Sequence, residues 1–452
     1  MRRPEPLRKL PREQIITQKF LETFKRFTRI EANSGVVLLI TAIVALLWAN
    51  SPWASSYHHL WEIPLGISFA GFEFTQSLHF WINDALMTIF FLVVGMEIRY
   101  EMHGGLLSDI RQAGLPISAA VGGVLVPSLI YLVFNLEGGR HVGWAVPAAT
   151  DIAFAVGLLA LLGRGIPHSL RIFLLALAII DDIIAVLIIA VFYTTGLDYS
   201  GFWIAGGGLL MVLAMQRMGI GFAWAYVVPG FIVWFGVLTT GIHPTLTGVL
   251  LGLMTPVVQR RSRVKPINMV TRFNRQLLSK YGAAPGDILE PLEKLRLAQR
   301  DLLPPVIRVQ ASLEAWVAFL IMPLFALANA GISLGGIDFS QAGASWATIG
   351  VALALVVGKP AGVMAASWLA IRTGIGKLPK GVTPSGLLLI GLFAGVGFTM
   401  SIFISMLAFT DTNLLNAAKL GVLLGSFAAG ALGLAWGWVW LRMNKKNAEE
   451  AA

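Results

Sequence analysis

The sequence predicts an all-α polytopic membrane protein with a small extracytoplasmic β-hairpin. Hydrophobic residues make up 56% of its 452 residues and charged residues only 13%, whereas an ordinary soluble domain carries about 25% charged residues. Apolar runs recur along the whole chain, and several reach the roughly 20 helical residues that cross a hydrocarbon core. The chain contains no cysteine, which excludes disulfides, thiolate metal sites and cysteine nucleophiles.

About twelve apolar runs are predicted to be transmembrane helices. They lie near residues 35–50, 78–100, 113–136, 144–163, 170–193, 201–216, 220–240, 243–259, 312–334, 345–371, 383–409 and 415–441. An even number of spans places both termini on one side of the membrane. Of the 34 Lys and Arg residues, 31 lie in or beside the N-terminal arm, the even-numbered connections and the C-terminal tail. Because cytoplasmic segments carry an excess of basic residues, both termini are predicted to be cytoplasmic.

The charge of the chain needs no nucleic-acid partner. Its formal net charge of +10 is accounted for by basic residues beside anionic lipid. A single transmembrane domain is predicted over residues 35–442, between an arm of residues 1–34 and a tail of residues 443–452. Apolar residues recur at helical spacing among Lys and Arg in the arm, at Ile16, Phe20, Phe24 and Phe27. This pattern predicts a helix that lies on the cytoplasmic face of the membrane.

Two soluble segments interrupt the membrane domain. Residues 62–76, with alternating apolar residues on both sides of Ala70 and Gly71, are predicted to form an extracytoplasmic β-hairpin. Because an isolated hairpin is marginal in water, it is expected to pack on another surface, and the same hairpin of a second subunit would give a homodimer. The cytoplasmic connection at about 260–310 has a basic start and a helix-prone continuation. It is interpreted as either a regulatory or a merely solvated insertion.

Four charged residues are predicted to lie deep in the membrane. They are Asp151 in "VPAATDIAFAVG", Asp181 and Asp182 in "AIIDDIIA", and Lys359 in "VVGKPAG". Each charge at the bilayer centre costs roughly 2.5 to 3.5 kcal/mol, so each requires a reason. A buried ion pair that only docks helices would leave three carboxylates against one lysine. Neighbouring helical residues point about 100° apart. One aspartate of the pair should therefore line a cavity, while the other pairs with another residue or lies at the edge of the cavity.

An excess of buried carboxylates predicts exchange of cations for protons. Such groups can reduce their charge in a water-filled cavity by binding a proton or a cation. If the cavity opens to one side at a time, competition between the two ions becomes antiport. Carboxylates, the hydroxyl of Thr150 and carbonyls freed at a helix break are oxygen ligands that suit a hard cation.

Two helix breaks are indicated near these residues. Pro147 precedes Thr150 and Asp151 in the fourth span, and "GLFAGVGFTMSIF" places three glycines in the eleventh. Broken helices expose partial charges, positive at N-ends and negative at C-ends. If the breaks cross, Asp151 could offset the positive partial charges at the helix N-ends, and Lys359 could offset the negative partial charges at the C-ends. Direct pairing of Lys359 with Asp181 is an alternative role, and the sequence does not choose between the two.

At these residues the chain resembles the bacterial NhaA-type sodium/proton antiporters. The resemblance covers the membrane region through "WINDALMTIFFLVVGMEI", "PAATDIAFAVGLLALLG", "LLALAIIDDIIAVLIIA", "GIHPTLTGVLLG", "PLFALANAGI", "GKPAG" and "GVGFTMSIFI". It implies twelve helices in the bacterial inner membrane, with inverted three-helix repeats and two crossed discontinuous helices. It also implies export of Na⁺ or Li⁺ in exchange for a larger number of external H⁺, which supports pH and sodium homeostasis. No resident cofactor is expected.

The resemblance implies roles for the deep residues. Asp181 and Asp182 match the family's essential aspartate pair, with Asp182 the principal ligand of the transported Na⁺. Thr150 and Asp151 match the Thr-Asp at the first helix break and are expected to take part in cation or proton binding. Lys359 matches the lysine that either compensates helix ends or pairs with Asp181.

Four further residues match positions nearer the membrane surfaces. Asp84 lies where the family has an aspartate near the periplasm, and Glu97 and Glu101 match acidic residues at the cytoplasmic mouth that are linked to pH activation. His243 matches a histidine with a similar association. The alternative is that the two glutamates are solvated at a helix end and that His243 is a turn residue before Pro244.

The chain departs from the family's best-known pattern in three places. Tyr100 stands where a basic residue is usual, and "RVQASLEAW" before the ninth span lacks some charged and histidine residues. The cytoplasmic insertion that precedes this segment is also longer. Transport chemistry is therefore expected to carry over, whereas the pH profile is not.

The alternatives to an antiporter are an intramembrane aspartyl protease and a cation-coupled solute symporter. The protease would need a Gly-x-Gly-Asp signature, and Asp151 instead follows Ala-Ala-Thr. The symporter would add polar groups that recognise a solute, and the deep polar inventory is small. His-Glu-x-x-His and Gly-x-x-x-x-Gly-Lys-Ser/Thr motifs are also lacking, which argues against a zinc peptidase and an ATP-driven pump. The chain is therefore predicted not to be an enzyme.

Overall fold

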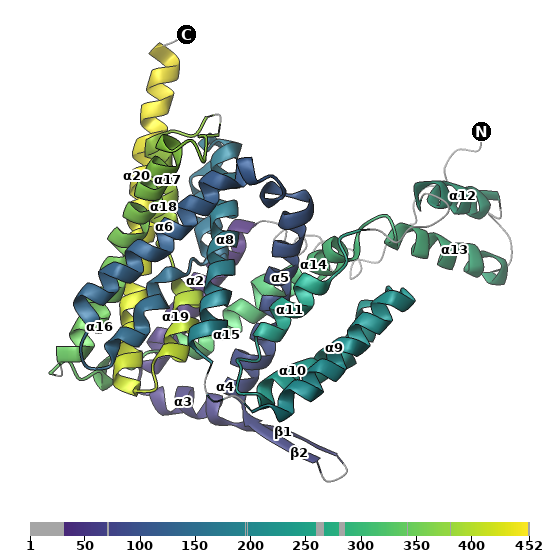
Figure 1. Ribbon diagram of the computed structural model, residues 1–452, viewed down its shortest axis with the longest axis horizontal. Helices are drawn as coiled ribbons and strands as arrows, with labels where there is room; N and C mark the ends of the chain where they lie inside the picture. The colour runs from purple at the N-terminus through teal and green to yellow at the C-terminus, as the bar shows by residue number, and fades with distance from the viewer. Residues whose placement is uncertain are drawn as a thin grey trace, which may run out of the picture.

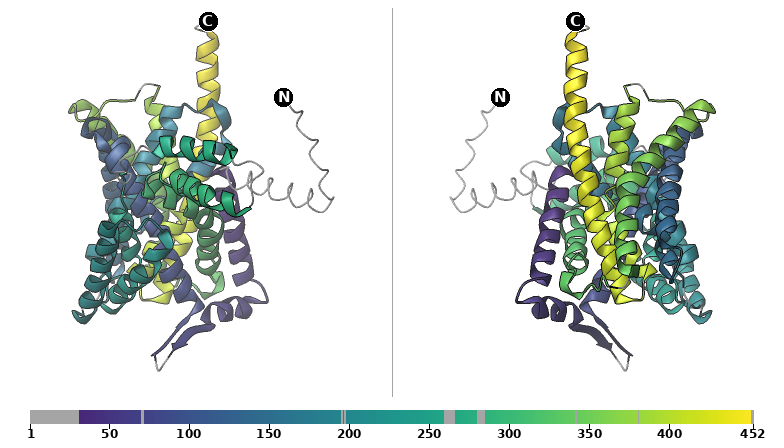
Figure 2. Two further views of the ribbon diagram at one scale, coloured as in Figure 1. Left: turned by 90° about the vertical axis from the view of Figure 1, so that its right-hand side faces the viewer. Right: turned by 90° about the vertical axis from the view of Figure 1, so that its left-hand side faces the viewer.

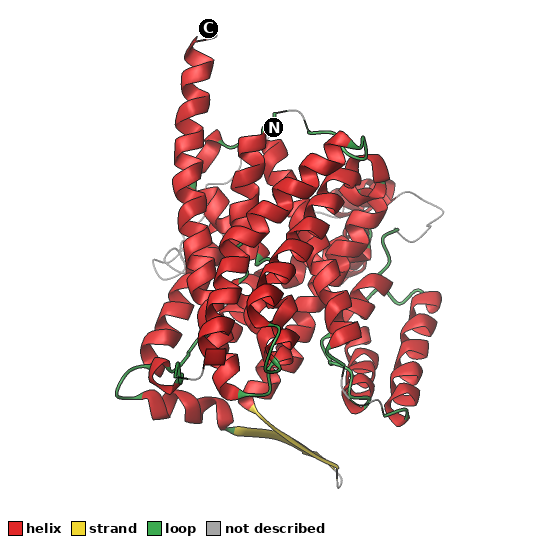
Figure 3. Cartoon of the chain, turned by 60° about the vertical axis from the view of Figure 1, so that its left-hand side comes forward, coloured by secondary structure: helices red, strands yellow, loops and turns green. Residues whose placement is uncertain are grey.

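The computed structural model describes residues 31–69, 72–194, 196, 198–258, 266–279, 285–340, 342–379 and 381–450. The interfacial helix expected around residues 16–27 lies outside these ranges. Helices account for nearly all of the regular structure in the described ranges, and the single pair of strands lies at one end of the molecule (Figure 3).

The helices and strands follow one another in the order that the hydropathy predicts. The strands and α-helices are α2 (Glu31–Ala49), α3 (Ala54–Glu62), β1 (Pro64–Phe69), β2 (Phe72–Ser77), α4 (Leu78–Phe80), α5 (Met87–Gly104), α6 (Ile110–Asn135), α7 (Ile152–Leu161), α8 (His168–Phe192), α9 (Ser200–Met218), α10 (Val227–Thr239), α11 (Leu246–Met254), α12 (Pro266–Ser279), α13 (Pro285–Arg300), α14 (Pro305–Trp316), α15 (Met322–Asn329), α16 (Ala342–Leu353), α17 (Lys359–Arg372), α18 (Pro384–Ala394), α19 (Phe398–Ala408) and α20 (Thr412–Glu450).

Short segments of other helix types join several of these α-helices. The π-helical segments are η1 (Trp81–Leu86), η6 (Val317–Ile321) and η8 (Ala354–Gly358). The 3₁₀ segments are η2 (Leu106–Ser108), η3 (Arg140–Ala148), η4 (Gly163–Gly165), η5 (Ala223–Tyr226) and η7 (Leu334–Gly336). Segment η8 directly precedes Lys359, so the helix that carries this lysine changes its winding just before it.

Among the described residues, seven continuous helices are long and apolar enough to cross a membrane, and three further helix pairs meet the same criteria together but bend at a short break. Each of the twelve predicted spans coincides with helical structure, although twelve crossings remain a prediction. The ranges near 220–240 and 243–259 hold shorter helices than expected, α10 and α11. Helix α11 is only nine residues long because Pro244 and Pro256 bound it, and proline cannot continue a helical hydrogen-bond ladder.

Most helices form one bundle, from which α9 and α10 stand apart as a pair (Figure 1). The β1–β2 hairpin and the C-terminus lie at opposite ends of the molecule, and α20 extends well beyond the bundle (Figure 2). The predicted tail at 443–452 is therefore a continuation of α20 as far as Glu450. The α12–α13 unit lies beside the bundle, in the connection predicted at 260–310.

The predicted β-hairpin is confirmed. Strands β1 and β2 pair antiparallel from Pro64 opposite Ser77 to Phe69 opposite Phe72. The ring of Phe74 makes edge contacts with the rings of Phe80, Trp81 and Phe235, at centroid distances of 6.1, 5.8 and 6.0 Å. The base of the hairpin is thus anchored on its own chain through aromatic packing.

Close backbone contact between α6 and α17 fixes the position of Lys359. A Cβ atom added to Gly122 would lie 2.4 Å from the carbonyl oxygen of Gly362, and one added to Gly362 would lie 2.1 Å from that of Gly122. Only glycine permits two helices to approach this closely, a device common in membrane helices. The same packing holds the first turn of α17, where Lys359 begins the helix, in the interior of the bundle.

Candidate cation and proton site

Two broken helices meet at the centre of the bundle. The η3–α7 pair bends by 44° and the α18–α19 pair by 50°, at the places that Pro147 and the three glycines predicted. The Asp151 backbone N–H donates to the Val396 carbonyl at 2.8 Å, and Thr150 Oγ1 lies 2.9 Å from the Ala394 carbonyl oxygen. Each break therefore satisfies backbone groups of the other, which replaces the intrahelical hydrogen bonds that the breaks remove.

Asp151 holds the N-terminal ends of two half-helices. Its Oδ1 accepts from the Phe154 N–H in the first turn of α7 at 3.0 Å. Its Oδ2 accepts from the Thr399 N–H at 3.2 Å and from the Thr399 hydroxyl at 2.5 Å, at the start of α19. A carboxylate is stabilised there because helix N-ends carry unpaired N–H groups and partial positive charge.

Thr399 is a site residue that the sequence analysis missed. It lies in the quoted "GVGFTMSIF", directly after the glycines of the second break. Its side chain is fully buried, and a hydroxyl at the start of a half-helix was the available signal. The signal was weak, because threonine is common in membrane helices and only the fold brings it to Asp151.

Lys359 makes both of its alternative contacts at once, one with a helix end and one with Asp181. Its Nζ donates to the Ala148 carbonyl at 2.6 Å, at the C-terminal end of η3. It also lies 2.6 Å from Asp181 Oδ2 and 3.0 Å from Thr150 Oγ1. The three donors of one ammonium group therefore reach a helix end, a carboxylate and a hydroxyl.

The two neighbouring aspartates differ in their surroundings. Asp181 Oδ2 is bound to Lys359 and lies 2.7 Å from the Thr150 hydroxyl. By contrast, Asp181 Oδ1 and Asp182 Oδ1 are buried and have no hydrogen-bond partner within the described part of the chain. Both side chains are at most 1% exposed. Buried oxygens without a partner are rare and costly, so these two atoms are where a proton or a cation would be gained.

The donor set suits a hard cation. Carboxylate, hydroxyl and carbonyl oxygens are the ligands that alkali and other hard cations prefer. Among the described residues, no cluster of three or more His, Cys, Asp or Glu residues could hold a metal ion. A cation between Asp181 and Asp182 would be completed by uncharged oxygens such as that of Thr150.

Glu97 and Glu101 lie on α5, and both side chains are partly buried. The charge of Glu97 lies close enough to interact with that of Asp182. Both glutamates have interaction partners of their own. Glu97 therefore interacts electrostatically with Asp182 of the aspartate pair.

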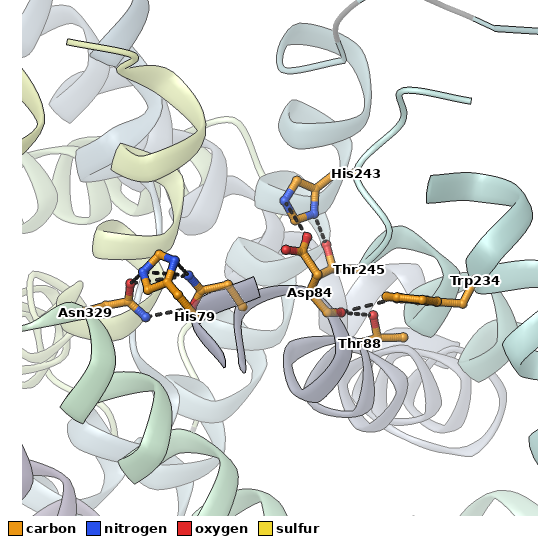
Figure 4. A network of polar contacts seen from close by, with 8 residues as sticks. His79, Asp84, Thr88, Trp234, His243, Thr245 and Asn329 are labelled. Atoms are coloured by element: carbon orange, nitrogen blue, oxygen red, sulfur yellow. Dashed lines mark hydrogen bonds and ion pairs between the residues drawn. The ribbon is translucent and has the colours of Figure 1, made fainter. Parts of the chain in front are cut away.

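Asp84 and His243, which the sequence could not place together, form one network (Figure 4). His243 Nε2 lies 3.5 Å from Asp84 Oδ1, and His243 Nδ1 lies 2.8 Å from the Thr245 hydroxyl. The ring of Phe403 in α19 meets the His243 ring edge-on at 5.3 Å. The Asp84–His243 pair thus contacts the half-helix that follows the second break.

A neighbouring amide network, also seen in Figure 4, was not anticipated. The Asn329 amide donates to Asn83 Oδ1 at 2.7 Å, and His79 Nε2 lies 3.0 Å from Asn329 Oδ1. Asn83 and Asn329 are 5% and 1% exposed. This network joins η1 to the end of α15. Asparagines within apolar runs gave no signal in the sequence, because their partners come from distant helices.

The chain is similar to one known protein family and to several antiporters. The family described as Na⁺/H⁺ antiporter 1 matches residues 25–437. A Na⁺/H⁺ antiporter NhaA of Bordetella petrii is 62% identical over 440 residues, which cover 96% of this chain and 94% of that protein. Antiporters of the same name from Cupriavidus necator, at 58% identity over 98% and 95% of the two chains, and from Bartonella tribocorum, at 52% identity over 96% of each, are also similar.

Proposed function

Because the chain belongs to the Na⁺/H⁺ antiporter 1 family, we propose that it exports Na⁺ or Li⁺ across the bacterial inner membrane in exchange for more than one external H⁺. The family membership confirms the resemblance carried by the sequence motifs. Members of this family are transporters and not enzymes, so the protease and symporter alternatives are not favoured. The antiport would support pH and sodium homeostasis.

The observation that carries the mechanism is the unequal environment of the two aspartates. Asp182 has a buried oxygen without a partner, whereas Asp181 is paired with Lys359. In the proposed cycle the site holds either protons on Asp181 and Asp182 or one cation between them. Lys359 neutralises Asp181 in the state that carries neither ion. This assignment makes Asp182 the principal cation ligand, with Asp181 and Thr150 completing the site.

Competition for one site produces antiport. A cation that arrives from the cytoplasm displaces the protons from the aspartates, and protons from the other side displace the cation. If two protons exchange for one monovalent cation, each cycle moves one net charge. That charge couples transport to the membrane potential at about 2.3 kcal/mol per 100 mV.

The two helix breaks allow the site to change its exposure. Asp151 holds the N-ends of α7 and α19, and Lys359 holds the C-end of η3. Because these charges offset the partial charges of the half-helix ends, the break can persist in an apolar environment. We assign Asp151 and Lys359 this charge-compensating role. Lys359 would relax its contact with Asp181 when that aspartate binds a proton.

Four residues nearer the surfaces are proposed to control ion access or the response to pH. Glu97 and Glu101 would act at the cytoplasmic mouth. The charge of Glu97 would act on the aspartate pair through its electrostatic interaction with Asp182. Asp84 and His243 would act together from the extracytoplasmic side of the membrane, through their 3.5 Å contact. Because a proton gained by either residue changes the charge of this contact, the Asp84–His243 pair is proposed to respond to pH.

The finer architecture is part of the same proposal. Twelve transmembrane helices and cytoplasmic termini are supported by the distribution of basic residues. The inverted three-helix repeats are inferred from the family alone. A homodimer through the β1–β2 hairpin is supported by the 46% exposure of Leu65 on the hairpin surface. Crosslinking of a single cysteine placed in the hairpin would test the dimer.

Inside-out vesicles that contain the protein provide the decisive test. A preformed pH gradient should collapse when Na⁺ or Li⁺ is added, and the rate should change with an imposed membrane potential. An unchanged gradient over a broad pH range would reject antiport. A one-for-one exchange that ignores voltage would reject the proposed stoichiometry alone.

A further inference from the structure

The insertion between α11 and α14 forms a helical hairpin with one uncovered side. Helices α12 and α13 pack against each other, and Pro291 and Ala298 are buried on one side of α13. On the other side, Leu289 is 57% exposed and Leu292 is 37% exposed. Arg296 follows Leu292 by one helical turn, so the two leucines and this arginine share a side of the helix.

The C-terminal end of α13 is held against the connection between α9 and α10. The Arg300 guanidinium lies 4.7 Å from the centre of the Phe222 ring. Arg308 donates to the Gly221 carbonyl at 2.9 Å and to the Arg300 carbonyl at 3.2 Å. The backbone on both sides of this point is therefore fixed to the end of the α9–α10 pair.

The α9–α10 connection marks the level of a membrane surface. Its Phe222 and Trp224 side chains are 59% and 86% exposed. Exposed aromatic residues at the ends of apolar helices are typical of the interface between lipid and water. Figure 1 shows α13 nearer than α12 to this pair, beside the bundle and beyond the end of the pair that points away from the β1–β2 hairpin. The contacts of Arg300 and Arg308 thus hold the C-terminal end of α13 at this level.

The charge of the insertion selects the kind of surface. The described part of the insertion, residues 266–279 and 285–308, contains six basic and four acidic residues, a net charge of +2. Basic residues close to a membrane attract anionic lipid headgroups. This side combines exposed leucines with Arg296 and Glu293, a mixture of apolar and charged residues that is found on interfacial helices.

We propose that the outer side of α13 lies on the membrane surface, with Leu289 and Leu292 at the acyl-chain boundary and Arg296 on anionic phospholipid headgroups. This interaction surface is separate from the ion site and does not depend on the proposed transport cycle. It assigns the insertion a lipid partner and gives it a function beyond a solvated connection.

Single fluorescent reporters test the proposal on the full-length protein. Because the chain contains no cysteine, Leu292→Cys and Lys294→Cys each provide one labelling position. Lys294 is exposed and stands roughly 160° around α13 from Leu292, so it serves as the matched control. In phosphatidylcholine vesicles that contain phosphatidylglycerol, a lipid-attached quencher should act on the label at 292, and aqueous iodide should act on the label at 294.

Charge dependence provides the second measurement. Adding Arg296→Gln to the Leu292→Cys variant should lower the ratio of membrane-bound to free helix by about fivefold, which corresponds to the loss of one basic residue near an anionic surface. Omitting phosphatidylglycerol should lower the ratio further. Iodide quenching at position 292 in anionic vesicles would overturn the proposal. Equal shielding of that label in anionic vesicles, neutral vesicles and detergent would also overturn it, and would indicate that another protein surface covers α13.

Discussion

Replacing Lys359 by methionine should destabilise the protein strongly, because the change leaves a buried carboxylate without its cation. Lys359 Nζ lies 2.6 Å from Asp181 Oδ2, and both side chains are fully buried. Removing one partner of a buried pair costs about 3 to 5 kcal/mol. At 1.4 kcal/mol per power of ten, the ratio of unfolded to folded protein should rise by about two to four powers of ten. Equilibrium unfolding in mixed micelles, followed by tryptophan fluorescence, measures this change.

Lys419 provides a matched control for this prediction. It is also a buried lysine, 9% exposed, but it has no ion pair among the described residues. Lys419→Met should therefore have a much smaller effect than Lys359→Met, since it leaves no carboxylate unpaired. The double variant Lys359→Met/Asp181→Asn should recover most of the lost stability, because replacing both partners removes the unpaired charge.

Two results would refute the reasoning. If Lys359→Met and Lys419→Met are equally stable, the Lys359–Asp181 contact contributes nothing specific. If the double variant is no more stable than Lys359→Met alone, the loss comes from the helix-end contact with Ala148 and not from the unpaired Asp181. The second outcome would retain Lys359 as a compensator of helix ends and remove its pairing role.

Other substitutions test the remaining contacts. Asp182→Asn should abolish Na⁺ and Li⁺ binding in a titration that leaves the fold intact, and retained binding would place the cation elsewhere. Thr399→Val should cost about 1.5 to 3 kcal/mol of stability by removing a hydrogen bond to a carboxylate, with Thr399→Ser close to the parent protein. Asp84→Asn and His243→Gln should shift the pH profile of transport in vesicles alike, because each removes the same contact, and unrelated shifts would separate the two residues. Burial raises the pKa of Tyr57 from 10.0 to about 12, so its contribution to stability is full below pH 10 and is lost as pH rises toward 12; Tyr57→Phe should remove this alkaline loss from unfolding curves.

Much of the fold was predictable because membrane insertion is decided by local composition. Each of the twelve apolar ranges contains helical structure, and the alternating residues at 62–76 form the expected hairpin. The exceptions have local causes that can be found in the sequence. Pro244 and Pro256 shorten α11 to nine residues, and the last predicted span continues as one helix beyond its apolar part.

The candidate site was predictable in its members more than in its contacts. Charges in apolar runs are conspicuous, so Asp151, Asp181, Asp182 and Lys359 stood out at once. Thr399 and Asn329 did not, because a polar uncharged residue costs little in a membrane helix and has many ordinary uses. Their importance depends on partners that no local pattern identifies, Asp151 for the first and Asn83 for the second.

The sequence by itself determined that the chain crosses a membrane, which charges lie within it and where two helices can break, since hydropathy, proline and glycine act within a few residues. Only the tertiary structure decided that Lys359 pairs with Asp181 while one oxygen of Asp182 has no hydrogen-bond partner among the described residues, and that Asp151 joins the ends of two half-helices. These contacts link residues 178 and 248 positions apart. Which atoms meet over such separations follows from how the broken helices pack, and packing is a property of the whole bundle.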